Sequence, residues 1–311
     1  HTNPLSEEGG FELSESLITK NSPGKDKIDL FLALFKGRVD VCAKRWKNKP
    51  GYSPYCYNDF KPGICNKPKI KCTECKNSLF APLDEEQIKN HLLGKYVLGL
   101  YPMTTNDTCF LLAMDFDEST WGDDIKVVIK VCKDNSIPVY AERSRSGKGC
   151  HLWFFFERET KASLARKFGT IILNLAMQEC GNIKFDSYDR LFPSQDFLQK
   201  DGFGNLIALP LQKEAREYGN SVFIDINLNE IGDQWLYLSQ VKRISEEFLI
   251  RFCKLVTPIQ TNDENERIDR ESKSNPSDKI DFSETVLLKR GNGLLVSKSG
   301  LSPKALFLIR R

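Results

Sequence analysis

The order of six segments between residues 109 and 186 constrains the fold more than any other feature of this chain. Apolar, β-prone runs alternate with helical patterns in the order β-α-β-β-α-β, which is typical of a ferredoxin-like or RRM-like sheet. We therefore predict an α+β fold built around such a sheet. The strands are expected at residues 109–117, 138–142, 151–156 and 183–186, and the helices at 123–135 and 161–180.

The first of these strands ends in two acidic residues, Asp115 and Asp117, on either side of Phe116. Side chains alternate between the two faces of a strand, so the carboxylates share one face and Phe116 points to the other. Two carboxylates in this arrangement repel each other unless a cation lies between them, and Mg²⁺ or Mn²⁺ prefers such oxygen ligands. An isolated D-x-D is more often a strand end in solvent, so the neighbouring segments decide between the two interpretations.

The sequence ERSRSGKGCH at residues 142–151 joins two strands that are expected beside this acidic pair. Glycines let a backbone approach phosphate oxygens closely, and several amide groups can then point at one anion. A plain hairpin turn needs glycine but not three cations, so the loop favours a triphosphate-binding site. The candidate nucleotide-binding residues here are Arg143, Arg145, Ser146, Gly147, Lys148, Gly149 and His151.

A carboxylate pair that faces a phosphate-binding loop is the minimum equipment for two-metal phosphoryl transfer, in which one ion activates a hydroxyl and the other binds the triphosphate. A third carboxylate usually completes such a site, and Asp186, Asp189 and Asp225 are the candidates. We expect Asp186, because it ends the strand that can lie beside the D-x-D strand. The predicted ligands of two catalytic Mg²⁺ or Mn²⁺ ions are therefore Asp115, Asp117 and Asp186.

A cluster of four cysteines follows the pattern C-x8-C-x6-C-x-x-C at Cys56, Cys65, Cys72 and Cys75. A C-x-x-C pair lets two thiolates chelate one ion, and tetrahedral Zn²⁺ takes four ligands. We expect one structural Zn²⁺ in a small subdomain that faces DNA, with free thiols as the alternative. The clustering favours a reducing cytoplasm over a secreted disulfide scaffold. Lysines are frequent at residues 61–76. They either contact the phosphates of a nucleic acid or belong to a loop that contacts only solvent.

Composition and pattern divide the chain into five parts. Residues 1–37 are expected to form an N-terminal lead-in and helix, 38–83 the zinc-binding subdomain, 84–258 the catalytic core, 259–278 a polar linker, and 279–311 a truncated C-terminal segment. No apolar run approaches the roughly 20 residues that span a bilayer, so no membrane association is expected. The net charge of +3 is too small to indicate a nucleic-acid ligand by itself.

Three motifs in this order and spacing resemble motifs I, II and III of the archaeo-eukaryotic primase superfamily. They are DFD, SRSGKGCH and the stretch DSYDRLFPSQDFLQKDGFGNLIALPLQ. The likeness is greatest to the primase-polymerase branch of TOTE conflict systems and of CRISPR-associated primase-polymerases. It extends from about Lys20 to Leu238 and includes the cysteine cluster.

The resemblance implies a primase-polymerase core in which an αβ module packs on an RRM-like sheet. By position, Asp115 and Asp117 would bind both metals, with Asp186 as the third ligand. Ser146, Lys148 and His151 would hold the phosphates and sugar of the incoming nucleotide, helped by Arg143 or Arg145. The residues that would add triphosphate or template contacts are Arg190, Gln195 and Lys213.

The expected function is therefore template-dependent synthesis of DNA or RNA that starts and extends strands from dNTPs or NTPs on single-stranded DNA. The resemblance implies a role in a CRISPR-associated or mobile-element conflict system, with a helicase or CRISPR adaptation proteins as partners. One alternative is a gap-filling repair polymerase of the same superfamily, which cannot start strands. The other is a zinc-dependent nucleic-acid-binding module without catalysis.

Overall fold

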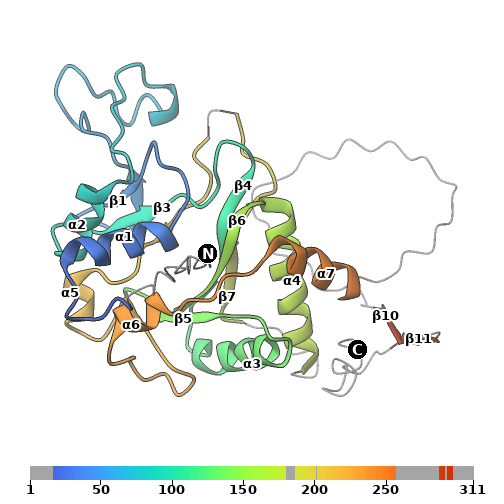
Figure 1. Ribbon diagram of the computed structural model, residues 1–311. Coiled ribbons are helices and arrows are strands. Elements are labelled where there is room, and N and C mark those ends of the chain that lie inside the picture. Colours follow the sequence, from blue (N-terminus) through green and yellow to red (C-terminus); the bar gives the residue numbers. More distant parts are fainter. Residues whose placement is uncertain (1–16, 180–185, 201, 257–286, 291–292, 297–311) are drawn as a thin grey trace, which may run out of the picture.

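The computed structural model of the protein describes residues 17–179, 186–200 and 202–256, and the backbone of two further strands. These are β10 (Leu287–Arg290) and β11 (Gly293–Val296), which pair antiparallel. The other described residues form two antiparallel sheets with helices packed around them, as Figure 1 shows. The predicted α+β class is confirmed. The predicted linker at 259–278 lies outside the described residues.

The larger sheet has the strand order β7-β4-β6-β5-β9, and each neighbouring pair is antiparallel. The elements β4, α3, β5, β6, α4 and β7 follow one another in the predicted order. Of the fourth predicted strand, residues 183–185 lie outside the described residues and residue 186 lies in a turn. The strand β7 of the sheet begins at Tyr188. The strands are β4 (Thr108–Phe116), β5 (Tyr140–Arg143), β6 (Cys150–Lys161), β7 (Tyr188–Phe192) and β9 (Val222–Phe223).

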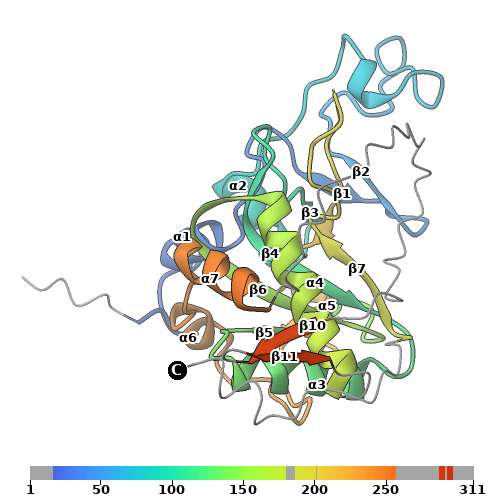
Figure 2. The same cartoon turned by 90° about the vertical axis from the view of Figure 1, so that its right-hand side faces the viewer.

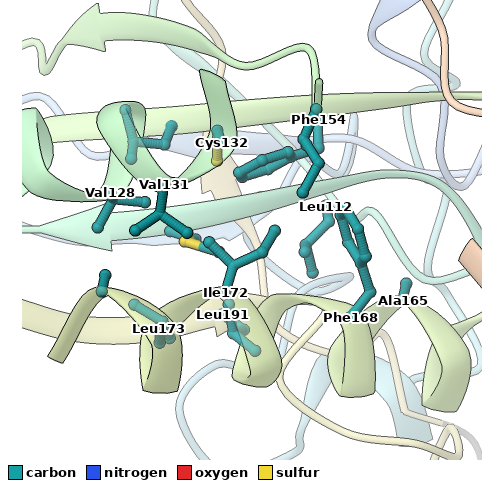
Figure 3. Close-up of a cluster of buried hydrophobic side chains, with 14 of the residues drawn as sticks. Leu112, Val128, Val131, Cys132, Phe154, Ala165, Phe168, Ile172, Leu173 and Leu191 are labelled. Atoms are coloured by element: carbon teal, nitrogen blue, oxygen red, sulfur yellow. The ribbon is translucent and has the colours of Figure 1, made fainter. Parts of the chain in front are cut away.

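Three helices cover one face of this sheet: α3 (Trp121–Asp134), α4 (Ala162–Glu179) and α7 (Glu246–Val256). Their apolar stripes pack on alternate residues of the strands, among them Leu112 and Phe154, which are fully buried. Figure 3 shows these side chains meeting residues of α3 and α4. Because Leu112 and Phe116 share a face of β4, this core fixes which side of the strand the acidic residues occupy.

The smaller sheet has the order β2-β1-β3-β8 and packs, with its helices, against the other face of the larger sheet. Trp153 and Phe155 of β6 project into this second core, where Phe35 contacts both rings edge-on. The elements are β1 (Ala43–Arg45), β2 (Tyr52–Pro54), β3 (Leu98–Leu100), β8 (Ile207–Ala208), α1 (Gly24–Leu34), the 3₁₀ turn η1 (Cys72–Glu74), α2 (Glu85–Leu92), α5 (Lys213–Arg216) and α6 (Gln234–Ser239). The predicted domain boundary at residue 83 therefore crosses a sheet, because β1 pairs with β3.

His91 ties α2 to this sheet and is not available as a ligand. Its Nδ1 accepts the backbone N–H of Leu98 at 3.0 Å, and its Nε2 donates to the carbonyl of Pro210 at 2.9 Å. Burial is the main reason that the pKa of His91 falls to about 4, so the ring is neutral. None of the described helices combines the length and the apolar character needed to cross a bilayer.

Candidate active site

The two acidic residues of the D-x-D motif lie where β4 ends, between β6 and β7. Asp115 pairs in register with His151 of β6 on one side and with Arg190 of β7 on the other. Phe116 is buried in the core under α3 and α4, as its alternation with the acids predicts. The carboxylates therefore face the smaller sheet, at the junction of the two layers.

A buried chain of polar side chains supports this end of β4. His151 Nδ1 donates to Oε2 of Glu142 at 2.6 Å, and Trp153 Nε1 donates to the same oxygen at 3.3 Å. Glu142 is only 1% exposed. On the other side of the imidazole, Nε2 lies 3.5 Å from Oδ1 of Asp115. The ring is thus held between two carboxylates.

These contacts determine the charge of His151. Burial alone would lower its pKa, but the charge and hydrogen bond of Glu142, followed by the charges of Asp115 and Asp117, raise the pKa to about 9. The imidazole is therefore protonated at neutral pH and places a fixed cation beside the acidic pair. The sequence interpretation did not include Glu142. The signal that could have indicated Glu142 was an acidic residue on the same face of a buried strand as Tyr140.

The environment of Asp115 fits a divalent cation. Its Oδ1 is buried and has no hydrogen-bond partner, and a buried polar atom without a partner is costly. Burial is the main cause that raises the pKa of Asp115 to about 6, opposed by His151 and reinforced by Asp117 and Asp189. A metal ion would supply the missing partner and favour the ionised carboxylate.

The acidic pair is open and does not form a closed metal cage. Across the described parts of the chain, no group of three or more His, Cys, Asp or Glu side chains is arranged to hold a metal ion. Mg²⁺ commonly binds to proteins through one or two carboxylates, with substrate phosphates and water completing its octahedron. Asp115 and Asp117 suit that mode of binding.

Of the three candidates for a third carboxylate, Asp189 is the one whose charge acts on the acidic pair. The negative charge of Asp189 raises the pKa of both Asp115 and Asp117, and β7 carries it in an irregular step of the ladder beside β4. Asp186 is an exposed turn residue before β7. Asp225 follows the far edge strand β9 and accepts the backbone N–H groups of residues 227 and 229 of its own turn.

The glycine-rich loop packs directly on the acidic strand. A Cβ at Gly149 would lie 2.4 Å from Oδ1 of Asp117 and 2.4 Å from the carbonyl oxygen of Phe116, so only glycine fits. Gly147 has a φ of 75°, in the left-handed region that glycine adopts without strain. Ser146, Lys148 and Asp117 together line an open cavity of about 550 Å³, with Trp121 at its wall.

A Gly149→Ala substitution is expected to lower nucleotide incorporation about 100-fold, because displacing a catalytic group by about 1 Å can cost that much. The added methyl group would push Asp117 or the loop out of place. Gly24→Ala is the matched control, since a Cβ at Gly24 meets nothing within 4 Å. Single-turnover incorporation measured for both variants checks the prediction, and equal rates would contradict it.

The other predicted nucleotide-binding residues differ in how they are placed. Arg143 does not present its guanidinium to the cavity, because Nη1 donates to the carbonyl of Gly219 at 2.6 Å and Nη2 to that of Leu228 at 2.5 Å. Arg190 pairs with its neighbour Asp189 at 2.6 Å, beside the acidic pair. The side chain of Arg145 contacts Tyr52 of β2. Gln195 is half-buried in the loop after β7, and Lys213 lies at the start of α5 next to Gly94.

The four clustered cysteines come together in space. Cys56, Cys65, Cys72 and Cys75 all line one small cavity of about 20 Å³, and each is a half-buried free thiol. They do not form a recognisable metal cage within the described residues. The predicted Zn²⁺ therefore stays a prediction.

The chain matches the family model of the TOTE conflict system, Archaeo-Eukaryotic Primase domain, over residues 26–252. It belongs to this family. The matched span contains the acidic pair, the glycine-rich loop and the cysteine cluster of this primase domain.

Comparison with solved structures finds the polymerase domain of Mycobacterium tuberculosis Ligase D in complex with DNA. The two chains are 13% identical, and the match covers 74% of this primase domain's chain and 87% of the other. The TM-score is 0.35, so nothing about the site follows from this likeness. No curated protein matches the chain.

Proposed function

We propose that this primase domain is a template-dependent nucleotidyltransferase that starts and extends strands from dNTPs or NTPs on single-stranded DNA. The observation that carries the proposal is the buried Oδ1 of Asp115, which has no hydrogen-bond partner, together with the loop that packs on Asp117. Carboxylates that can hold metal ions, next to a cavity lined by Lys148 and Ser146, are what nucleotidyl transfer requires. A conflict system with a helicase or CRISPR adaptation proteins is the proposed setting.

Asp115 and Asp117 would hold two Mg²⁺ or Mn²⁺ ions, and we propose Asp189 as the third carboxylate in place of Asp186. When bound, such ions activate the attacking hydroxyl and stabilise the leaving pyrophosphate. The protonated His151 supplies a fixed positive charge at the same edge, held in orientation by Glu142. Lys148 and Ser146 bind the triphosphate from the loop side of the cavity.

Primer synthesis on unprimed single-stranded DNA with labelled nucleotides and Mn²⁺ tests this function. Products from the wild type would support a primase-polymerase. Extension of an annealed primer without any unprimed product would favour the gap-filling polymerase instead. DNA binding without incorporation in either assay would refute the proposal and leave a nucleic-acid-binding module.

We further propose that the cysteine cavity holds one structural Zn²⁺. Four thiolates leave no open coordination position, so the ion would order the loop and take no part in catalysis. The purified protein is expected to contain one zinc per chain by elemental analysis, and Cys75→Ala is expected to lose it. Cys253→Ala, outside the cluster, is the control. Wild-type protein that contains no zinc when purified, and whose stability does not change when zinc is added, would contradict this proposal.

A further inference from the structure

The β1–β2 hairpin carries a concentration of positive charge that the site described above does not use. Between residues 41 and 58 there are four cations, Lys44, Arg45, Lys47 and Lys49, and no acidic residue. None of the four takes part in an ion pair within the described part of the chain. Uncompensated charge of one sign on a protruding element attracts a polyanion.

The tip of the hairpin is ordered by its own contacts. The backbone N–H of Trp46 donates to the carbonyl of Gly51 at 3.0 Å, and its indole Nε1 donates to Oγ of Ser53 at 3.1 Å. The Trp46 ring lies over Gly51, where a Cβ would come within 2.5 Å of it. Lys49 Nζ sits 4.3 Å from the ring centroid. A preorganised tip loses little conformational freedom on binding.

The hairpin connects to the candidate active site. Arg45 and Tyr52 face each other in register on β1 and β2. The charges of Arg145, from the loop between β5 and β6, and of Arg45 both act on the Tyr52 hydroxyl. The cations of the hairpin therefore adjoin the loop that packs on Asp117. β2 is the outer strand of its sheet (Figure 2), and no other strand of the described residues pairs with its free edge.

We propose that the β1–β2 hairpin is the surface that holds the single-stranded nucleic acid entering the site, with Lys47 and Lys49 on its phosphates. The proposal rests on the proposed function for its setting. The chemistry that recognises the strand is the combination of exposed lysines with an aromatic ring, which is common where proteins follow a single strand without reading its sequence.

Binding of a fluorescent oligo(dT) to the full chain in EDTA, without nucleotides, tests the proposal. Lys47→Ala/Lys49→Ala removes two exposed cations and is expected to weaken binding about 10-fold. The slope of log K against log salt is expected to fall in magnitude by about 1.4, since each phosphate contact on a single strand contributes about 0.7. Lys133→Ala/Lys254→Ala, which removes two exposed lysines from α3 and α7, is the matched control.

Wild-type affinity and salt slope in the hairpin variant would overturn the proposal, as would an equal loss in the control. Oligo(U) in a parallel arm distinguishes RNA from DNA as the strand, and weakening with either supports the proposal. A loss confined to duplex DNA would overturn it. Because this assay needs no catalysis, weakened binding in a protein that makes no product would refute the proposed function and leave the hairpin assignment standing.

The dependence of incorporation on template concentration tests the hairpin assignment in a protein whose nucleotidyltransferase activity is present. The hairpin variant is expected to raise the KM for template about 10-fold and to leave kcat at saturating template unchanged, because the residues at Asp115 and Asp117 are intact. Incorporation with an unchanged template KM would leave the proposed function in place and refute the hairpin assignment.

Discussion

An Asp115→Asn variant is expected to lose nucleotide incorporation by about 10³-fold, the scale on which preorganised electrostatic stabilisation acts, and to become more stable. The amide cannot supply the anionic oxygen that a hard cation requires. The carboxylate that it replaces is only 15% exposed, and its Oδ1 has no hydrogen-bond partner. Loss of activity with a gain of stability identifies a residue kept for function.

The sign of the stability change follows from the pKa of Asp115. Burial raises this pKa from 3.8 to about 6, so the folded protein binds the proton more tightly than the unfolded chain. The resulting stability is fully present below pH 3.8 and is lost as the pH rises through about 6. The difference corresponds to about 3 kcal/mol.

Metal-free Asp115→Asn protein is therefore expected to exceed the wild type in free energy of unfolding at pH 7.5 and to match it near pH 4. Denaturant titrations at both pH values measure this, with Asp225→Asn as a control whose carboxylate is exposed. An Asp115→Asn variant that is less stable than the wild type at pH 7.5 would show that the carboxylate is a structural element.

Glu142→Ala is expected to lower the free energy of unfolding by about 3 kcal/mol, the usual cost of breaking a buried charged pair. His151 Nδ1 and Trp153 Nε1 would both lose their acceptor in the core. Glu157→Ala, at an exposed position of β6, the strand that carries His151 and Trp153, is the control and is expected to change stability little. Urea denaturation of both variants measures the difference.

Glu142→Gln separates the charge of this residue from its volume. The pKa of His151 is raised from 6.5 to about 9, so the stability that its charge contributes is present below pH 6.5 and is lost as the pH rises through about 9. The deficit of Glu142→Gln relative to the wild type is therefore expected to shrink between those values. NMR titration of His151 is expected to give a lower pKa in the variant. An unchanged pKa would show that Glu142 does not set the charge of the ring.

The element order of the larger sheet was predictable because it depends on local periodicity. Runs such as 109–117 and 161–180 carry their own alternation or helical spacing, and they became β4 and α4 within a few residues. The acidic pair was predictable for the same reason, since its placement on one face depends only on the alternation of β4. The boundary at residue 83 stays a prediction; β1 on one side of it pairs with β3, more than fifty residues further along the chain, which no local pattern indicates.

The rest of the site depends on contacts that join distant segments. Arg143 was predicted as a phosphate ligand, but its guanidinium donates hydrogen bonds to the backbone carbonyls of residues 219 and 228. Asp186 was preferred to Asp189 as the third carboxylate, yet Asp189 lies in β7 where the ladder beside β4 is irregular, and its charge acts on Asp115. Strand pairing and bulges are set by tertiary packing, and a single sequence carries little signal for either.

Incorporation of one labelled nucleotide onto a primer annealed to single-stranded DNA tests the central claim most directly. The wild-type protein is expected to extend the primer with Mn²⁺ and to stop when EDTA is added. Asp115→Asn/Asp117→Asn is expected to form no product while binding the DNA normally. Extension by the double variant at the wild-type rate, or none by the wild type with Mn²⁺ and intact DNA binding, would contradict a nucleotidyltransferase centred on these two carboxylates.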